Sequence, residues 1–263
     1  LQSNDSEGII AIGYGTLQLN TGIQNAALGY RALANNTSGE SNYAFGWNAL
    51  YSNTTGNQNI GIGTDALYQN TTGFRNIGIG YSALYDNITG ANNVALGPYA
   101  LSSNTSGSYN IAVGDSLNYN TEGSSNVAVG YYSLLYNVTG NENVGIGLNS
   151  LRDNTTGSNN NAFGSYSLEN NETGNSNVGL GSYALRDNTT GSLNTAVGNN
   201  AMASSASGSE NVAIGSSALY HGDGGYQNVA VGAQSMYSNT SSYENTAIGY
   251  ASLQSITAGY QNL

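Results

Sequence analysis

The sequence predicts an all-β fold, a parallel β-solenoid of about fifteen turns of 17 residues each. Three observations lead to this prediction. A glycine that closes an Ala-Ile-Gly-like tripeptide recurs every 17 residues, with two steps of 16. Apolar residues recur in the same register in every repeat, and most repeats carry Asn-Thr-Thr-Gly or a close variant, which is turn chemistry.

The unit Asn59–Arg75 defines positions 1 to 17 of the repeat. Positions 2 to 4 are predicted to form a strand, because a small residue separates two apolar ones and position 2 favours β-branched types. The glycine at position 5 is predicted to bend the chain. A second short strand is expected at positions 8 to 10, and a turn at positions 12 to 15, where Gly would supply a positive φ.

Stacked turns bury an apolar face that a single turn cannot bury. We expect position 4 and the Leu or Met at position 9 to line a narrow core, with position 2 beside them. The Asn at position 1 is expected to form an internal ladder between turns. The predicted ladder includes Asn59, Asn76, Asn93, Asn110, Asn126 and Asn143.

Position 3 is always Ala or Gly and alternates with the expected core residues, so it is predicted to face outward. Its small size suggests that a second backbone packs closely there, as in an assembly of several parallel rods around a common axis. The alternative is that these residues only fill a thin monomeric coil. The predicted close-packing stripe includes Ala44, Gly61, Gly78, Ala95 and Ala112.

The composition excludes several classes of partner. Lysine is absent, four arginines are the only strongly basic residues, and the net charge is −11. A nucleic-acid interface needs clustered Lys and Arg, and docking to anionic lipid needs basic residues too. The chain contains no cysteine, and no apolar run approaches the ~20 residues that span a bilayer.

No residue pattern predicts catalysis, so the chain is expected not to be an enzyme. His221, with Asp223 and Ser216 or Ser217 nearby, contains the residue types of a hydrolase triad, but an irregular solvated loop is the favoured interpretation. The acidic residues fall mostly at bends and do not pair as glycosidase carboxylates do. No catalytic residue, cofactor site or metal site is predicted.

Two sets of residues are candidates for surface roles. Aromatic rows could contact a sugar or a protein, or could stack on one another at the edge of the solenoid; they include Trp47, Tyr51, Tyr68, Tyr85, Tyr220 and Tyr237. Asn-x-Ser/Thr sequons recur at position 12, and Asn53, Asn70, Asn154 and Asn188 are possible glycosylation sites, although the turn alone explains them.

The units Asn211–Leu219 and Asn245–Leu253, which read Asn-Val-Ala-Ile-Gly-Ser-Ser-Ala-Leu and Asn-Thr-Ala-Ile-Gly-Tyr-Ala-Ser-Leu, resemble the head repeats of trimeric autotransporter adhesins. They are also similar to shaft repeats of bacteriophage tail fibres and of related bacterial surface proteins. The resemblance implies a trimeric parallel β-roll that projects from a cell or virion surface and contacts a host cell, matrix or glycan. The adhesin repeats are usually shorter.

The chain is therefore expected to be a single solenoid over 1–263, with a partial turn at 1–8, full turns at 9–261 and an unfinished turn at 262–263. The predicted function is an extracellular structural or adhesive fibre segment that associates with itself and contacts a host glycan or protein, without nucleic acid and without membrane insertion. The alternative is a subunit of an extracellular filament that stacks head to tail. A glycan-active or ice-binding solenoid is the distant alternative.

Overall fold

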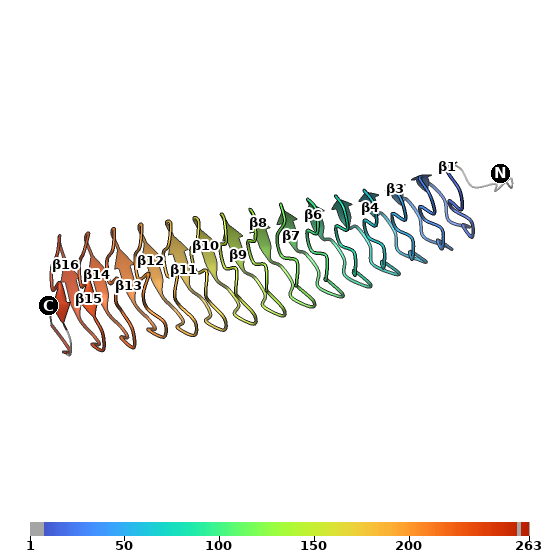
Figure 1. Cartoon of the computed structure of the whole chain (residues 1–263). Helices are drawn as coiled ribbons and strands as arrows, with labels where there is room; N and C mark the ends of the chain where they lie inside the picture. Colours follow the sequence, from blue (N-terminus) through green and yellow to red (C-terminus); the bar gives the residue numbers. More distant parts are fainter. Residues whose placement is uncertain (1–7, 257–258, 263) are drawn as a thin grey trace. The chain divides into compact units, whose positions relative to one another are not determined.

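One short strand per repeat forms the main parallel sheet of this protein. The computed structural model describes residues 8–256 and 259–262, which pack as two units, Leu1–Asn126 and Val127–Leu263. The strands of the first unit are β1 (Ile10–Ile12), β2 (Ala26–Leu28), β3 (Tyr43–Phe45), β4 (Ile60–Ile62), β5 (Ile77–Ile79), β6 (Val94–Leu96) and β7 (Ile111–Val113) (Figure 1).

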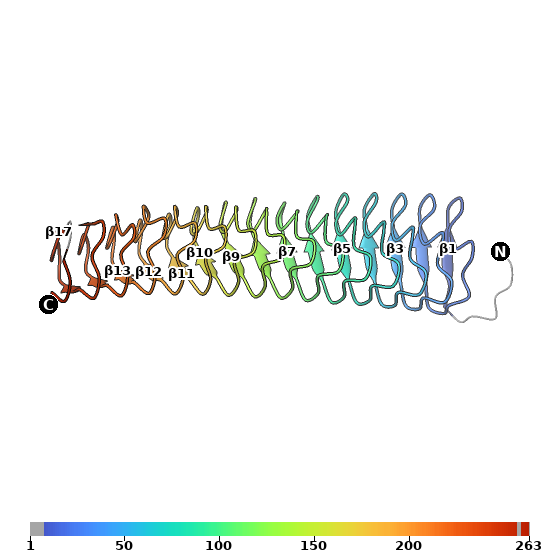
Figure 2. The same cartoon turned by 90° about the horizontal axis from the view of Figure 1, so that it is seen from below.

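The second unit repeats this arrangement. Its strands are β8 (Val127–Val129), β9 (Val144–Ile146), β10 (Asn161–Phe163), β11 (Val178–Leu180), β12 (Thr195–Val197), β13 (Val212–Ile214), β14 (Val229–Val231), β15 (Ser238–Asn239), β16 (Thr246–Ile248) and β17 (Ser255–Ile256). Figure 2 shows the same strands from a second side, each followed by a long excursion that returns to the next turn.

Strand pairing keeps like residues above like. In the first unit β4 pairs parallel with β5 so that Ile60 lies beside Ile77 and Gly61 beside Gly78. In the second unit β13 and β14 pair in the same way. No helix occurs among the described residues. The predicted all-β parallel solenoid with a 17-residue repeat is therefore confirmed.

The core is narrower than predicted, and each strand turns the Ala or Gly at position 3 toward it. The largest fully buried side chains are the Leu and Met residues at position 9, and the Ala or Ser at position 8 lies beside them. Position 3 points inward: Ala44, Ala95 and Ala112 have no exposed surface, and Gly61 and Gly78 are buried.

Our assignment of the two strand faces was therefore wrong. Position 4 was expected in the core, but Ile62 and Ile79 are 36% and 38% exposed. The reason is space, because a Cβ added at Gly61 would lie 3.3 Å from Leu50 Cγ. The core has room for a methyl group from the strand and for nothing larger, so position 3 is small because of the chain's own core and not because of a second backbone.

The strand predicted at positions 8 to 10 is replaced by a turn. Asp65 at position 7 and Leu67 at position 9 both adopt a left-handed conformation, with φ of 55°. This geometry aims the two amides in opposite directions: Asp65 N–H donates to Trp47 O in the preceding turn, and Leu67 N–H donates to Ala83 O in the next. The chain thus continues its ladder between turns without extended backbone.

The glycine at position 15 is needed for a reason different from the one predicted. Gly73 does not have a positive φ, so the turn does not require glycine for its backbone conformation. An added Cβ would instead lie 2.3 Å from Asn70 Oδ1 and 2.5 Å from Gly90 O. Adjacent turns approach too closely there for any side chain.

The predicted partial turn at 1–8 lies outside the described residues except for Gly8, and so does Leu263 of the unfinished turn. Whether the two units form one domain, as the single repeat predicts, stays a prediction.

Candidate functional site

The outward side of the strands forms an apolar surface in each unit. We call the side chains at positions 2 and 4 of the strands the sheet face. Position 2 is half-buried in most turns, and position 4 is more open. The large exposed residues at position 4 are Ile12, Leu28, Phe45, Ile62, Ile79 and Leu96 in the first unit, and Ile146, Phe163, Leu180, Ile214 and Ile248 in the second.

The sheet face contains no charged residue, although the chain as a whole has a net charge of −11. Exposed apolar residues are common singly on soluble proteins, whereas a continuous row of them makes this face a candidate binding surface. The sequence did not lead us to this surface, because we assigned its residues to the core. The signal that was present is that position 2 tolerates Asn161, Thr195 and Thr246, which a buried position would accept only with hydrogen-bond partners.

Behind the sheet, the Asn at position 1 forms the expected ladder. Asn59 N–H donates to Asn42 Oδ1 at 3.0 Å, and Asn76 N–H donates to Asn59 Oδ1 at 3.0 Å. The Asn59 Nδ2 group also donates to Gly73 O at 2.8 Å, which ties the start of one turn to its end. The same pattern continues through other buried members of the ladder, including Asn93, Asn110, Asn126 and Asn143.

The Asn at position 12 forms a second buried ladder, and this argues against glycosylation at the four possible sites. Asn70 Nδ2 donates to Asn53 Oδ1 at 2.8 Å and to Gly73 O at 3.0 Å. Asn154 and Asn188 make the equivalent bonds and, like Asn53 and Asn70, have no exposed surface. A glycan on any of these Nδ2 atoms would remove the bonds that hold the turn, so the contacts favour the turn interpretation of these asparagines over glycosylation of the folded chain.

The predicted aromatic rows are stacks whose inner ring faces are covered. Tyr68 lies between Tyr51 and Tyr85, with centroids 5.2 and 5.1 Å apart and planes within 6°. Tyr220 and Tyr237 stack in the same way. The Trp47 ring stacks on Tyr30 with centroids 4.4 Å apart, and Tyr30 also stacks on Tyr14. Rings in such stacks offer their edges to solvent, so a sugar could lie flat only on the end of a stack.

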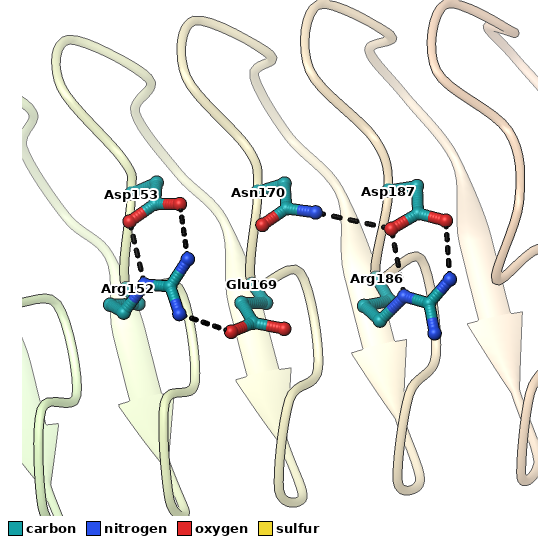
Figure 3. A network of polar contacts seen from close by, with 6 residues as sticks. All are labelled: Arg152, Asp153, Glu169, Asn170, Arg186 and Asp187. Atoms are coloured by element: carbon teal, nitrogen blue, oxygen red, sulfur yellow. Dashed lines mark hydrogen bonds and ion pairs between the residues drawn. The ribbon is translucent and has the colours of Figure 1, made fainter.

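A polar network occupies positions 10 and 11 of three turns in the second unit (Figure 3). Arg152 donates to both oxygens of Asp153, and its Nη1 donates to Glu169 in the next turn. Asn170 donates to Asp187, which also accepts two bonds from Arg186.

The charges of this network are half-buried. The hydrogen bond to Asp153 raises the pKa of Arg152, and burial raises the pKa of Glu169 against the opposing effect of Arg152. Pairs of this kind contribute little to stability, about 1 kcal/mol or less. We interpret the network as a device that keeps successive turns in register.

The residues around His221 are not arranged as a hydrolase triad. The imidazole packs edge-on against Tyr220 and Tyr237, and Asp223 accepts a hydrogen bond from Ser207. The described residues contain no hydrogen bond from His221 to Ser216, Ser217 or Asp223. Across residues 8–256 and 259–262, no group of three or more His, Cys, Asp or Glu is placed to hold a metal ion, and no helix is long and apolar enough to cross a membrane.

No protein-family model matches the chain, and a comparison with curated proteins finds no significantly similar one. The resemblance to adhesin and tail-fibre repeats therefore stays a prediction.

Proposed function

We propose that this chain is a structural segment of an extracellular adhesive fibre, on a cell or virion surface, in which several copies pack side by side through their sheet faces. The observation that carries the proposal is the row of exposed apolar residues at position 4. Transfer of apolar surface out of water contributes roughly 25 cal/mol per Å², so a row of such residues favours association.

A second copy of this chain fits the sheet face better than an unrelated partner would. The same apolar residue type recurs at every turn with the 17-residue register, so an identical chain offers a matching row at matching spacing. The acidic residues would make copies repel one another, and those in the described part of the chain lie off the sheet face. Contact through this surface keeps the negative charge in solvent. Homotrimers and larger parallel bundles both meet these conditions.

The proposal is tested by the mass of the assembly in solution. Sedimentation equilibrium of the wild-type chain should give a fixed multiple of 27.1 kDa, with three copies as the expectation. The double variant Ile62→Lys, Ile79→Lys places two ammonium groups in the contact and should shift the mass toward one copy. Both side chains are exposed, so folding of the single chain should be retained by circular dichroism.

The matched control carries the same charge on another side of the same turns. Thr55→Lys, Thr72→Lys changes two exposed residues at position 14 and should leave the mass of the assembly unchanged. A wild-type chain that stays a single copy at high concentration would refute packing through the sheet face. A mass that grows without limit as concentration rises would favour the head-to-tail filament.

A further inference from the structure

A hollow of about 420 Å³ opens on the side of the first turns of the first unit. Its walls include Gln18, Arg31, Ala34, Asn35 and Tyr51, and we call it the Tyr51 hollow. It exists because Ala34 occupies position 10, where the next three turns carry tyrosine. A small side chain in that column leaves an empty space as wide as a ring. The volume falls in the range of small-molecule sites, about 300 to 1,000 Å³.

Tyr51 supplies this hollow with a free aromatic face. One face of the ring stacks on Tyr68, with centroids 5.2 Å apart and planes within 6°. The other face points toward the preceding residue of the same column, Ala34, which has no ring to cover it. An uncovered aromatic face binds flat apolar surfaces and C–H groups, which the face of a pyranose ring presents. Tyr51 is thus the end of a stack on which a sugar could lie flat.

Arg31 supplies the hollow with a cation. Its guanidinium lies 5.2 Å from the centroid of the Tyr30 ring and has no carboxylate or hydrogen-bond partner among the described residues. Arg152 and Arg186, in contrast, are held by carboxylates. A guanidinium presents a planar fork of donors that matches a carboxylate with two parallel hydrogen bonds.

Two carboxamides complete the polar lining. Gln18 is exposed and Asn35 is half-buried, and neither side chain has a hydrogen-bond partner within the described part of the chain. Carboxamides both donate and accept, as sugar hydroxyls do. The hollow is therefore lined by a guanidinium without a carboxylate partner, two carboxamides without hydrogen-bond partners among the described residues, and the uncovered face of Tyr51.

We propose that the Tyr51 hollow binds an acidic pyranoside, a sugar ring that carries a carboxylate. The ring lies on the free face of Tyr51, its carboxylate pairs with Arg31, and its hydroxyls bond to Gln18 and Asn35. The choice of an acidic sugar follows from the charge, because in a chain with a net charge of −11 a local cation is what admits an anion. This proposal rests on the attachment role proposed above, but it does not require the sheet-face assembly.

The test uses isothermal titration of the full chain with two matched probes, a tetramer of galacturonic acid and the same tetramer with its carboxylates methyl-esterified. We expect saturable binding of the acidic tetramer and binding at least about tenfold weaker for the ester, since hydrogen bonds to a charged group are the stronger ones. Sedimentation of the same samples reports the assembly state, so loss of assembly and loss of binding are separate results.

Two variants test which residues form the site. Each introduces a residue that another turn of the chain already carries at the same position of the repeat. Arg31→Gln should abolish the preference for the acidic probe; Gln234 occupies position 7 with a φ of 57°, so glutamine fits this backbone. Tyr51→Leu should remove binding of both probes; Leu135 already stands at position 10.

Two control variants change the same residue types elsewhere. Arg75→Gln alters an exposed guanidinium that bonds to Gln58, and Tyr237→Leu alters a position 10 tyrosine of the second unit. Both should bind like the wild type. Three results would overturn the proposal: no binding of the acidic probe at millimolar concentration, equal binding of the two probes, or equal losses in the controls and in the Arg31 and Tyr51 variants.

Discussion

Replacing Asn70 by alanine should destabilise the solenoid more than its single amide group suggests. The side chain is fully buried, and it joins three turns. Its Nδ2 donates to Asn53 Oδ1 at 2.8 Å and to Gly73 O at 3.0 Å, while its Oδ1 accepts a bond from Asn87 Nδ2 at 2.8 Å. Truncation to alanine removes all three bonds at once.

The magnitude follows from what remains bonded afterwards. Gly73 O keeps the bond from Asn59 Nδ2 at 2.8 Å, and Asn87 Nδ2 keeps its bond to Gly90 O at 3.0 Å. Asn53 Oδ1 is left buried without a donor. The two lost bonds whose partners keep another hydrogen bond cost about 1 kcal/mol each, and the orphaned Asn53 acceptor costs about 1 to 3 kcal/mol. We therefore expect the free energy of unfolding to fall by roughly 3 to 5 kcal/mol.

The loss is measured by urea unfolding followed by far-ultraviolet circular dichroism, with hydrogen exchange to locate it in the turns next to Asn70. Gln69→Ala is the control, because Gln69 is half-buried in the same turn and its side chain has no hydrogen bond to a described residue. Equal destabilisation by the two variants would refute the view that the Asn ladder holds the turns together.

The structure predicts two further stability effects. Gly63→Ala should destabilise the chain strongly, because the new Cβ would lie 2.5 Å from Gly80 O at a φ of +131°. Gly61→Ala should be close to neutral, because its Cβ would meet its nearest atoms at 3.3 Å. Chemical unfolding of both variants measures the difference. Burial raises the pKa of the Asp86 carboxyl above its unfolded value of about 3.9. The protonated carboxyl therefore favours the folded state below the unfolded pKa, and this contribution to stability is lost as pH rises through the folded pKa. Asp86→Asn should therefore stabilise the chain at pH 7 and not at pH 3, and an equal gain at both pH values would contradict this cause.

The repeat predicted the architecture because its signals are redundant. A 17-residue period with glycine, asparagine and leucine in fixed places leaves one way to stack, and the parallel register of Ile60 with Ile77 follows from it. The buried Asn59 ladder was predictable for a similar reason, since a polar residue repeated at every turn must find its partners in the turns above and below.

The two faces of the strand could not be assigned from the pattern alone. Large-small-large alternation fits a strand that turns its large residues inward or outward, and we chose inward by the ordinary rule that apolar residues are buried. The deciding quantity was the width of the core, which Leu67 already fills from the opposite side. That width depends on the left-handed φ of 55° at Leu67 itself, a conformation that costs a non-glycine residue about 1 to 2 kcal/mol and that no sequence rule assigns to leucine.

The correct orientation changes the argument for self-association and makes it stronger. A small residue facing inward says nothing about neighbouring chains, so the Ala or Gly at position 3 does not support an assembly. The residues at position 4, however, now need an explanation that the turn does not provide. Strand propensity alone would admit threonine there, as position 2 does at Thr195 and Thr246. All fifteen residues at position 4 are instead Ile, Leu, Val or Phe. Contact with another molecule is the explanation that we propose for an apolar residue type that the fold does not require, and a second copy of the chain is the partner that would match it at every turn.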